Sequence, residues 1–339
     1  MKMMIGSFSV MAALCLACSP VAASASAAVG PGPDSGPNSA AVPDAAAVAA
    51  PGINHVYVVL DRATFDAIRS SDHLARLLGP PDGGLPDYGP PAADADRVFF
   101  RGQHSYIEFF APENRFKEPV GKVGLALAHD HDGDFDALER TWRTICGSDL
   151  RLTSAQWRRH NPPVPWYEAI QCDGTASGPH LAVWAMIYRP EFHRWLTSGS
   201  PARHEITRRA VLAARPGAGE ARFDVVGIEM ELAAASHDAL TGQLQAAGFQ
   251  REEAAAGTYL RGDGWTLVLR KVSTPPRLAS ITLAVKGTET QGRAMSPLPL
   301  GSAEARTSGA EMLRLHFGRT GESRAGTASD MNGERASHQ

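Results

Sequence analysis

The chain of 339 residues has no run of basic residues and no apolar run long enough to cross a membrane, the N-terminal one included. Its formal net charge is −3, and its lysine and arginine residues are dispersed, so no electrostatic footprint for nucleic acid or an anionic membrane surface is present. A nucleophile elbow, a phosphate-binding glycine loop and a dinucleotide fingerprint are all missing. The serine, histidine and aspartate residues show no triad spacing, which disfavours a hydrolase or a kinase.

Cysteine is scarce, because the chain has four and two of them, Cys15 and Cys18, lie near the N-terminus. The other two, Cys146 and Cys172, do not have the spacing of a zinc or redox motif. In an oxidising compartment we expect them to form a disulfide, worth roughly 3 kcal/mol if it is unstrained. Two buried thiols are the alternative, because the sequence does not fix their geometry.

The N-terminal segment has the parts of a secretory signal. A basic start at Lys2 is followed by a short apolar run and by an exit rich in alanine and serine, which predicts a signal peptide over residues 1–28. The stretch from Cys15 to Cys18 also resembles a bacterial lipobox, although Cys15 stands where leucine is usual. We therefore expect a secreted or periplasmic protein, with a lipid anchor on Cys18 as the open alternative.

The rest of the chain divides by composition. Residues 29–51 are rich in proline, glycine and alanine and predict a disordered linker, and the polar residues 318–339 predict a disordered tail. Between them, apolar and polar residues alternate in the patterns of folded structure over 52–200 and 222–290. A basic amphipathic stretch followed by alanine and glycine predicts a helical linker over 201–221.

The first folded segment predicts a strand, a helix and a hairpin. The β-branched and aromatic residues of Ile53–Asp61 favour a buried strand. Thr64–Leu78 has apolar residues at helical spacing, with Thr64 as the expected N-cap. After a proline-rich loop, Arg97–Arg101 and His104–Ala111 form the expected hairpin.

This pattern returns twice. Phe65–Ile68 is echoed by Phe135–Leu138 and by His237–Leu240, each with an apolar strand before it and a glycine after the helix. The third copy is the most regular and predicts a βαβββ unit that ends with the strand Leu278–Val285. A repeated unit is the simplest explanation, so we expect an α+β fold built from βαβββ units.

Four segments carry a likeness to known proteins: Asn54–Asp61, Tyr106–Phe110, Gly124–Asp130 and Trp184–Phe192. They resemble the vicinal oxygen chelate superfamily, in particular its bacterial glyoxalase-like branch and a related exported family of unknown function. The resemblance covers roughly residues 52–290. It implies paired βαβββ units whose sheets surround a cavity for a small-molecule ligand, and it does not identify an activity.

The resemblance also implies candidate site residues. His55 and Glu108 fit the first two ligands of a divalent metal ion in residue type and in place. The matching ligands from a later unit are absent at the aligned positions, but a shift of register brings in Glu229 or Glu231. His55, Glu108 and Tyr106 are also the expected wall of a ligand cavity, and no catalytic residue is assigned.

Three functions stay open from the sequence. The first is an exported glyoxalase-like protein that binds a small ligand and has no complete metal site. The second is a divalent-metal-dependent lyase, isomerase or dioxygenase of the vicinal oxygen chelate superfamily, and the third is a structural or partner-binding protein of the cell envelope. In the simplest structural interpretation, His55 donates to a nearby carbonyl oxygen and Glu108 pairs with Arg97 or Arg101.

One further polar cluster, His129–Asp136, carries several acidic residues. Its spacing departs from that of a calcium-binding EF-hand loop. We expect a turn in which Asp134 caps the helix that begins at Phe135. His129 stands at the expected end of a strand and is a further candidate metal ligand.

Overall fold

The computed structural model describes residues 49–173, 180–199, 206–273, 275–286, 297–308 and 311–318. All of these residues belong to one compact structural unit, because they pack mainly against one another. The predicted signal peptide, the lipobox cysteines, nearly all of the predicted linker and residues 319–339 of the predicted tail lie outside the described residues. Within the described part, no helix is long and apolar enough to cross a membrane.

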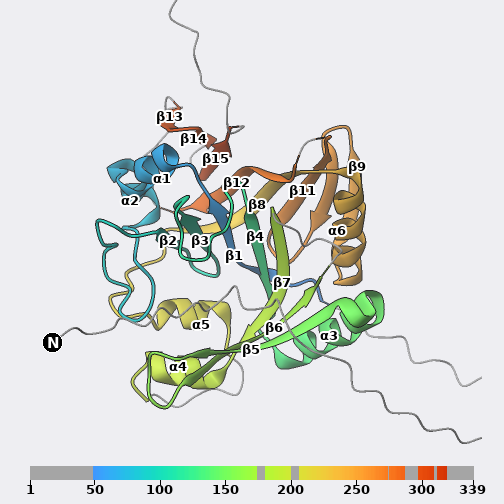
Figure 1. The fold of residues 1–339 in the computed structure, drawn as a ribbon, viewed down its shortest axis with the longest axis horizontal. Coiled ribbons are helices and arrows are strands. Elements are labelled where there is room, and N and C mark those ends of the chain that lie inside the picture. The colour runs from blue at the N-terminus through green and yellow to red at the C-terminus, as the bar shows by residue number, and fades with distance from the viewer. Residues whose placement is uncertain are drawn as a thin grey trace, which may run out of the picture. The chain divides into compact units, whose positions relative to one another are not determined.

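Two mixed β-sheets form the framework of the fold (Figure 1). Sheet A has seven strands in the order β2-β3-β1-β4-β7-β6-β5. Its strands are β1 Gly52–Val59, β2 Arg97–Arg101, β3 Tyr106–Phe110, β4 Val123–Ala128, β5 Leu150–Trp157, β6 Val164–Cys172 and β7 Leu181–Tyr188. Sheet B has eight strands in the order β13-β14-β15-β12-β8-β11-β10-β9. Its strands are β8 Phe223–Leu232, β9 Gln250–Ala254, β10 Gly257–Arg261, β11 Thr266–Lys271, β12 Arg277–Val285, β13 Leu298–Leu300, β14 Ala303–Ser308 and β15 Met312–Phe317.

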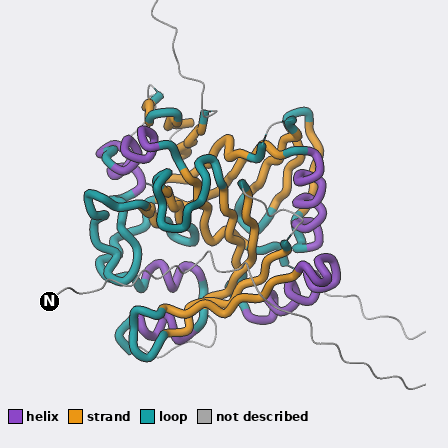
Figure 2. The backbone as a smooth tube through the Cα atoms, in the orientation of Figure 1, coloured by secondary structure: helices purple, strands orange, loops and turns teal. Residues whose placement is uncertain are grey.

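Six α-helices lie against these sheets (Figure 2). They are α1 Arg62–Arg69, α2 Asp72–Leu78, α3 Asp132–Cys146, α4 Pro190–Leu196, α5 Arg208–Ala213 and α6 Ala234–Ala246, with a single 3₁₀ turn at Gly147–Asp149. Helices α3 and α6 contact each other, as do α4 and α5. This count covers only the described part of the chain.

Sheet A joins two copies of the predicted unit. The first copy is β1-α1-α2-β2-β3 and the second is β4-α3-β5-β6-β7. In each copy the first strand lies parallel to the last, β1 to β3 and β4 to β7, as a helical crossover requires. The two copies meet along an antiparallel β1–β4 pair. The first copy has one strand fewer, and an isolated bridge between Asp82 and Phe99 stands at that edge.

Sheet B begins with a third copy, β8-α6-β9-β10-β11, in which β8 and β11 are parallel. Our prediction that Leu278–Val285 completes this copy is wrong. That segment belongs to β12, which pairs antiparallel with β8 and opens a fourth unit with β13, β14 and β15. The missing strand of the third copy is β9, whose residues Gln250–Ala254 are all exposed, so no apolar alternation marked it. The predicted α+β fold of repeated βαβββ units, of the vicinal oxygen chelate type, is confirmed.

The first predicted helix is two helices in the structure. Asp61, and not Thr64, caps α1: its carboxylate accepts a hydrogen bond from the backbone N–H of Thr64 (2.9 Å) and from the Thr64 hydroxyl (2.7 Å). Ser71 caps α2 in the same way. The expected cap Asp134 lies inside the first turn of α3, because that helix already begins at Asp132.

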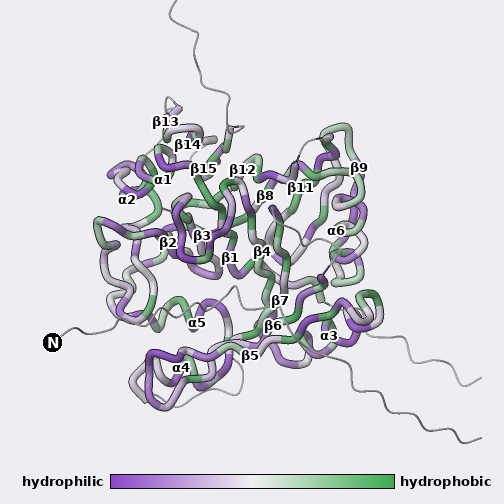
Figure 3. Tube along the Cα trace, in the orientation of Figure 1, coloured by the Kyte–Doolittle hydropathy of each residue, from purple (hydrophilic) through white to green (hydrophobic). Residues whose placement is uncertain are grey.

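A single apolar core extends across both sheets. The back face of sheet A, defined by Val56, Ile107, Leu125 and Val183, is fully buried in a cluster that also contains the inner residues of sheet B. Figure 3 shows the apolar residues gathered along β4, β7 and their neighbours, with hydrophilic residues on the helices. Because the side chains of both sheets fill one core, neither sheet buries its apolar face alone.

Polar contacts also join the sheets. Asp224 of β8 accepts hydrogen bonds through Oδ1 from the backbone N–H groups of His104 (2.7 Å) and Ser105 (3.1 Å), which lie between β2 and β3. Its Oδ2 lies 2.8 Å from Nδ1 of His104. The indole N–H of Trp265 donates to the carbonyl oxygen of Pro51 (3.2 Å). We call the Asp224 contacts the Asp224 clamp.

The expected disulfide is present. Cys146 ends α3 and Cys172 ends β6, and their Sγ atoms are bonded with the Cα atoms 5.7 Å apart. The bond ties the crossover helix of the second copy to the strand that it covers. Both cysteines are buried, so they lie in the core and not at a surface.

Candidate functional site

The front face of sheet A, opposite its back face, brings His55, Tyr106 and Glu108 together. Strands β1 and β3 pair in parallel with His55 opposite Tyr106 and Tyr57 opposite Glu108, so all four side chains point to one side. The rings of His55 and Tyr106 are stacked, with centroids 4.4 Å apart. The three residues predicted to bind a ligand thus share one surface, while ligand binding itself stays a prediction.

An irregularity in β1 fixes the orientation of His55. The pairing with β4 skips one residue, Asn54, so Asn54 and His55 both present their side chains to the front face. His55 Nδ1–H donates to Asn54 Oδ1 (2.8 Å), and the hydroxyl of Tyr188 lies 3.4 Å from the same oxygen. Burial, and then the nearby positive charge of Arg101, lowers the pKa of His55 to about 3, so the imidazole is neutral at physiological pH.

Glu108 is the acidic group of the front face. Its side chain is 10% exposed, and Oε1 lies 3.4 Å from Nη1 of Arg97. Burial raises the pKa of Glu108, and the positive charges of Arg97 and Arg101 oppose that rise. The carboxylate therefore stands in a place where water solvates it poorly and where one arginine at the rim is its direct partner.

Arg101 stiffens the edge of this face. Its guanidinium donates two hydrogen bonds to the Asp82 carboxylate, at 3.0 and 3.2 Å. It also lies over the rings of Phe99 (4.0 Å) and Tyr106 (4.3 Å). A buried cation that is paired and stacked in this way stays charged and holds Tyr106 in place.

The centre of the face is formed by small residues of β4 beneath large aromatic side chains. The Tyr57 ring lies directly over Gly124, where an added Cβ would come within 1.8 Å of it. The Trp184 ring stands edge-on to His55, with centroids 5.3 Å apart. The indole N–H of Trp184 is buried and has no hydrogen-bond partner among the described residues. Helices α4 and α5 supply Phe192 and Val211 to the apolar cluster on this face.

The central residues of the two faces of sheet A differ in how much of their surface solvent still reaches. His55, Tyr106, Glu108 and Trp184 keep between 5% and 9% of their surface exposed, whereas Val56, Ile107 and Leu125 on the back face keep none. These front-face side chains therefore keep some contact with solvent, while the three back-face residues keep none.

The predicted metal ligands Glu229 and Glu231 are not brought to His55 and Glu108. Both lie on β8 in sheet B, where Glu229 pairs with Arg270 (2.7 Å) and Arg314, and Glu231 pairs with Arg277 (2.7 Å). A shift of register by an even number of residues keeps a side chain on the same face of its strand, and this led from the position aligned with His55 to Glu229 and Glu231. It carries no information on whether β8 and β1 belong to the same sheet. The neighbour of β1 is β4, which presents Gly124 and Ala126 opposite Tyr57 and His55.

The residues present do not fit a complete metal site. His129 lies at the end of β4, buried, and burial lowers its pKa to about 4. Across the described residues, no three or more His, Cys, Asp or Glu side chains are grouped so that they could hold a metal ion. Arginines beside Glu108 and His55 oppose a second cation there. We therefore derive no chemistry through a bound metal.

Sequence reasoning missed Asp82, Tyr88 and Arg215 around the site. Asp82 and Tyr88 lie in the proline-rich segment after α2, and Arg215 follows α5. Arg215 Nη1 lies 3.4 Å from Asp82 Oδ2, so the segment is fastened to the edge of the front face by two arginines. No periodicity marks such a loop, and only the isolated Asp82–Phe99 bridge shows that it stands where a strand would be.

The strand order and the front face define a glyoxalase-like α+β protein of the vicinal oxygen chelate type. The chain belongs to the family described as "Family of unknown function (DUF5829)", which matches residues 53–312. No curated protein sequence matches the chain significantly.

Several solved structures are similar to this one. A crystal structure of a hypothetical protein from Staphylococcus aureus has a TM-score of 0.46 at 10% identity, covering 73% of this chain and 93% of that one. A crystal structure of catechol 2,3-dioxygenase has a TM-score of 0.41 at 13% identity, covering 75% and 83%. A mutant of 4-hydroxymandelate synthase from Streptomyces coelicolor has a TM-score of 0.36 at 14% identity, covering 68% and 70%.

Proposed function

We propose that this protein binds a small ligand on the front face of sheet A, with His55, Tyr106 and Glu108 at the wall of the site. The observation that carries the proposal is the indole N–H of Trp184, which is buried on this face and has no partner in the described part of the chain. A buried donor left unpaired costs roughly 1–3 kcal/mol, and a ligand acceptor would recover that free energy.

The chemistry of the face supports a planar ligand with polar substituents. The stacked rings of His55 and Tyr106 and the edge-on Trp184 offer aromatic walls. His55 is neutral, and because its Nδ1–H is held by Asn54, its Nε2 carries the lone pair and acts as an acceptor. Glu108 and Arg97 at the rim add one group of each charge. Such a mixture of apolar walls and few polar groups is typical of small-molecule sites.

We further propose that the protein acts outside the cytoplasm, as a secreted or periplasmic protein, with a form lipidated at Cys18 as the alternative. The N-terminal composition and the Cys146–Cys172 disulfide support this location. Intact mass of the protein recovered from its native host decides between the forms. Cleavage after the alanine-rich exit indicates a soluble product, and a lipidated Cys18 as the first residue indicates an anchored one. Retention of residues 1–28 would contradict export.

Two tryptophans permit a matched test of the binding site. Trp184 on the front face and Trp142 in the closed core both have a buried indole N–H that no described residue accepts. We would screen small aromatic ligands by thermal shift and measure the affinity of each hit for Trp184→Phe and Trp142→Phe. Trp184→Phe should weaken binding about 10-fold, the equivalent of one hydrogen bond, and Trp142→Phe should leave it unchanged. Equal affinities in both variants, together with no effect of Glu108→Gln, would refute the proposed site.

A further inference from the structure

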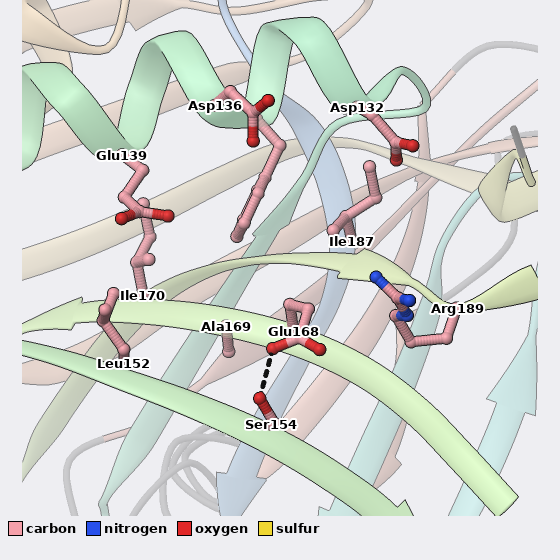
Figure 4. A pocket seen from close by; sticks show the side chains of 11 residues that line it. Asp132, Asp136, Glu139, Leu152, Ser154, Glu168, Ala169, Ile170, Ile187 and Arg189 are labelled. Atoms are coloured by element: carbon pink, nitrogen blue, oxygen red, sulfur yellow. Dashed lines mark hydrogen bonds between the residues drawn. The ribbon is translucent and has the colours of Figure 1, made fainter.

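A cavity of about 400 Å³ lies between α3 and the strands β5, β6 and β7 (Figure 4). Its apolar lining residues Ile170 and Ile187 belong to the back-face core, so the cavity opens beside that face and is separate from the ligand site proposed above. The proposed function does not use it.

Acidic side chains form the two walls of this cavity. Asp132, Asp136 and Glu139 are spaced by four and three positions along α3, which places them on one stripe of the helix. Glu168 of β6 lies on the opposite wall, where its carboxylate accepts a hydrogen bond from the Ser154 hydroxyl (2.5 Å). Figure 4 shows the helix stripe on one side and Glu168 on the other.

Little positive charge balances these carboxylates. Glu139 pairs with Arg143 at the surface (2.5 Å). Among the described residues no lysine, arginine or histidine forms an ion pair with Asp132 or Asp136. Arg189 lines one end of the cavity, and its Nε lies 3.7 Å from Glu191, which is outside the lining. The cavity therefore has an excess of negative charge and attracts a cation.

The floor of the cavity is apolar. Phe135 and Ile170 are buried beneath it, and Leu152 of edge strand β5 is 53% exposed at its side. Leu152 is one of few large apolar side chains left open to water in the described part of the chain. An exposed apolar side chain next to a hollow favours an occupant that has an apolar body.

A bare metal ion does not match this arrangement. No three of the described acidic, cysteine or histidine side chains are grouped so that they could hold a metal ion. We propose that the cavity binds a small organic cation, an alkylammonium with an alkyl or aryl body. Its ammonium group lies between the α3 stripe and Glu168, and its apolar body lies on Leu152 and Ile170.

Three probes of one size test the charge preference. Phenethylamine, 2-phenylethanol and phenylacetate have the same ring and carry a positive, no and a negative charge. Isothermal titration and shifts of the amide signals of α3 and β6 should show saturable binding of the amine, at least about 10-fold weaker binding of the alcohol and none of the acid. Equal binding of the amine and the alcohol would overturn the proposal.

Two pairs of variants locate the site. Asp136→Asn with Glu168→Gln should weaken amine binding about 10-fold, because each partly exposed ion pair contributes about 3-fold. The control Glu252→Gln with Glu253→Gln makes the same charge change on β9 and should have no effect. Leu152→Ser should weaken the amine and the alcohol alike, and Val120→Ser, at another exposed apolar residue, should weaken neither.

The outcomes separate this site from the front face. Trp184→Phe should leave amine binding unchanged, because Trp184 lies on the opposite face of sheet A. Loss of amine binding in Trp184→Phe, or its survival in the Asp136 and Glu168 variant, would refute the cation site. Either result would leave the front-face ligand site to be judged by its own ligand series.

Discussion

The first strands of the two sheets occupy the same place in the topology and carry opposite kinds of surface. Strands β1 and β8 each lie parallel to the last strand of their own copy and antiparallel to the first strand of the next. On β1 and its neighbour β3, His55 and Glu108 are buried among aromatic rings, and Glu108, the charged one of the two, has Arg97 as its ion-pair partner. On β8 the glutamates are saturated by arginines, of which Arg270 and Arg314 are 46% and 41% exposed.

This difference shows which sheet still has polar groups that could bind a ligand. A carboxylate that already holds two arginines, as Glu229 does, gains little from a ligand, because binding would have to displace existing pairs. Glu108 has one partner at the rim, and Trp184 nearby on the same face has none. The same fold thus has one face with unused binding capacity, on sheet A, and one face whose carboxylates are already paired, on sheet B. A few side chains make this difference, and it can be tested directly.

The largest effect should follow removal of the Cys146–Cys172 disulfide, which is present only in the half that contains sheet A. Replacing both cysteines by alanine frees a loop of about 25 residues and should lower the free energy of unfolding by about 3 kcal/mol. Hydrogen exchange should rise most in α3 and β6 and less in sheet B. Equal acceleration in both sheets would show that they do not differ in local stability.

A glycine in each sheet gives the next largest contrast. Gly124→Ala would place a Cβ 1.8 Å from the buried Tyr57 ring, and we expect a loss of about 2 kcal/mol in chemical denaturation, as for overpacked cores. A Cβ added at Gly227 of β8 would have its nearest neighbour, an atom of Thr282, at 3.2 Å. Gly227→Ala should therefore cost less than about 1 kcal/mol. Equal losses would mean that the Tyr57 ring moves aside freely.

Two carboxylates should respond oppositely to neutralisation. Glu229→Gln leaves Arg270 and Arg314 without their shared partner and should destabilise the protein by about 1 kcal/mol at neutral pH. Because burial raises the pKa of Glu108, its charged form is the unfavourable one. The stability that Glu108 contributes is full below its unfolded pKa near 4.5 and is lost as the pH rises through the raised folded pKa.

Denaturation between pH 4 and pH 8 measures this effect. Relative to Glu108→Gln, the parent protein should lose stability as the pH rises. The double replacement of Glu108 and Arg97 serves as control, since it removes the opposing charge as well. A parent protein that instead gains stability over Glu108→Gln with rising pH would show that Arg97 dominates burial.

The smallest effect should come from divalent metals. His55 and Glu108 have no third ligand among the described residues, so zinc, nickel, manganese or iron should not raise the melting temperature of the protein purified without chelator. His55→Ala should respond in the same way. About one equivalent of metal in the parent, lost in His55→Ala, would restore the metal-dependent enzyme as a candidate.

Local patterns in the sequence were sufficient for the repeated units and for part of the site. Strand β1, the β2–β3 hairpin and helix α3 follow from apolar periodicity, and helix α6 follows from its echo of the first two units. Strands β1 and β3 place His55 beside Tyr106. Periodicity carries no information on which strands share a sheet, so Glu229 was assigned to the wrong neighbourhood. Strands β5 and β9 are exposed edges whose polar residues give no apolar alternation.

The ion-pair partners of the charged side chains could not, for the most part, be predicted from the sequence. Arg101 finds Asp82 across a proline-rich loop, and Glu229 finds Arg314 across 85 positions of the chain. Such partners depend on the tertiary fold and not on spacing. Glu108 and Arg97 were predictable as a pair, because they lie on adjacent strands of one hairpin.

The Asp224 clamp bears on how this molecule can be divided or rebuilt. One carboxylate on β8 satisfies backbone donors of the turn between β2 and β3, and both sheets contribute to a common core. A gene fragment that encodes either sheet by itself would therefore yield a chain with an open hydrophobic side and unsatisfied amides at that turn. The two sheets therefore depend on each other for stability, and a protein rebuilt from one sheet would need a new partner for its apolar face and for the amides of that turn.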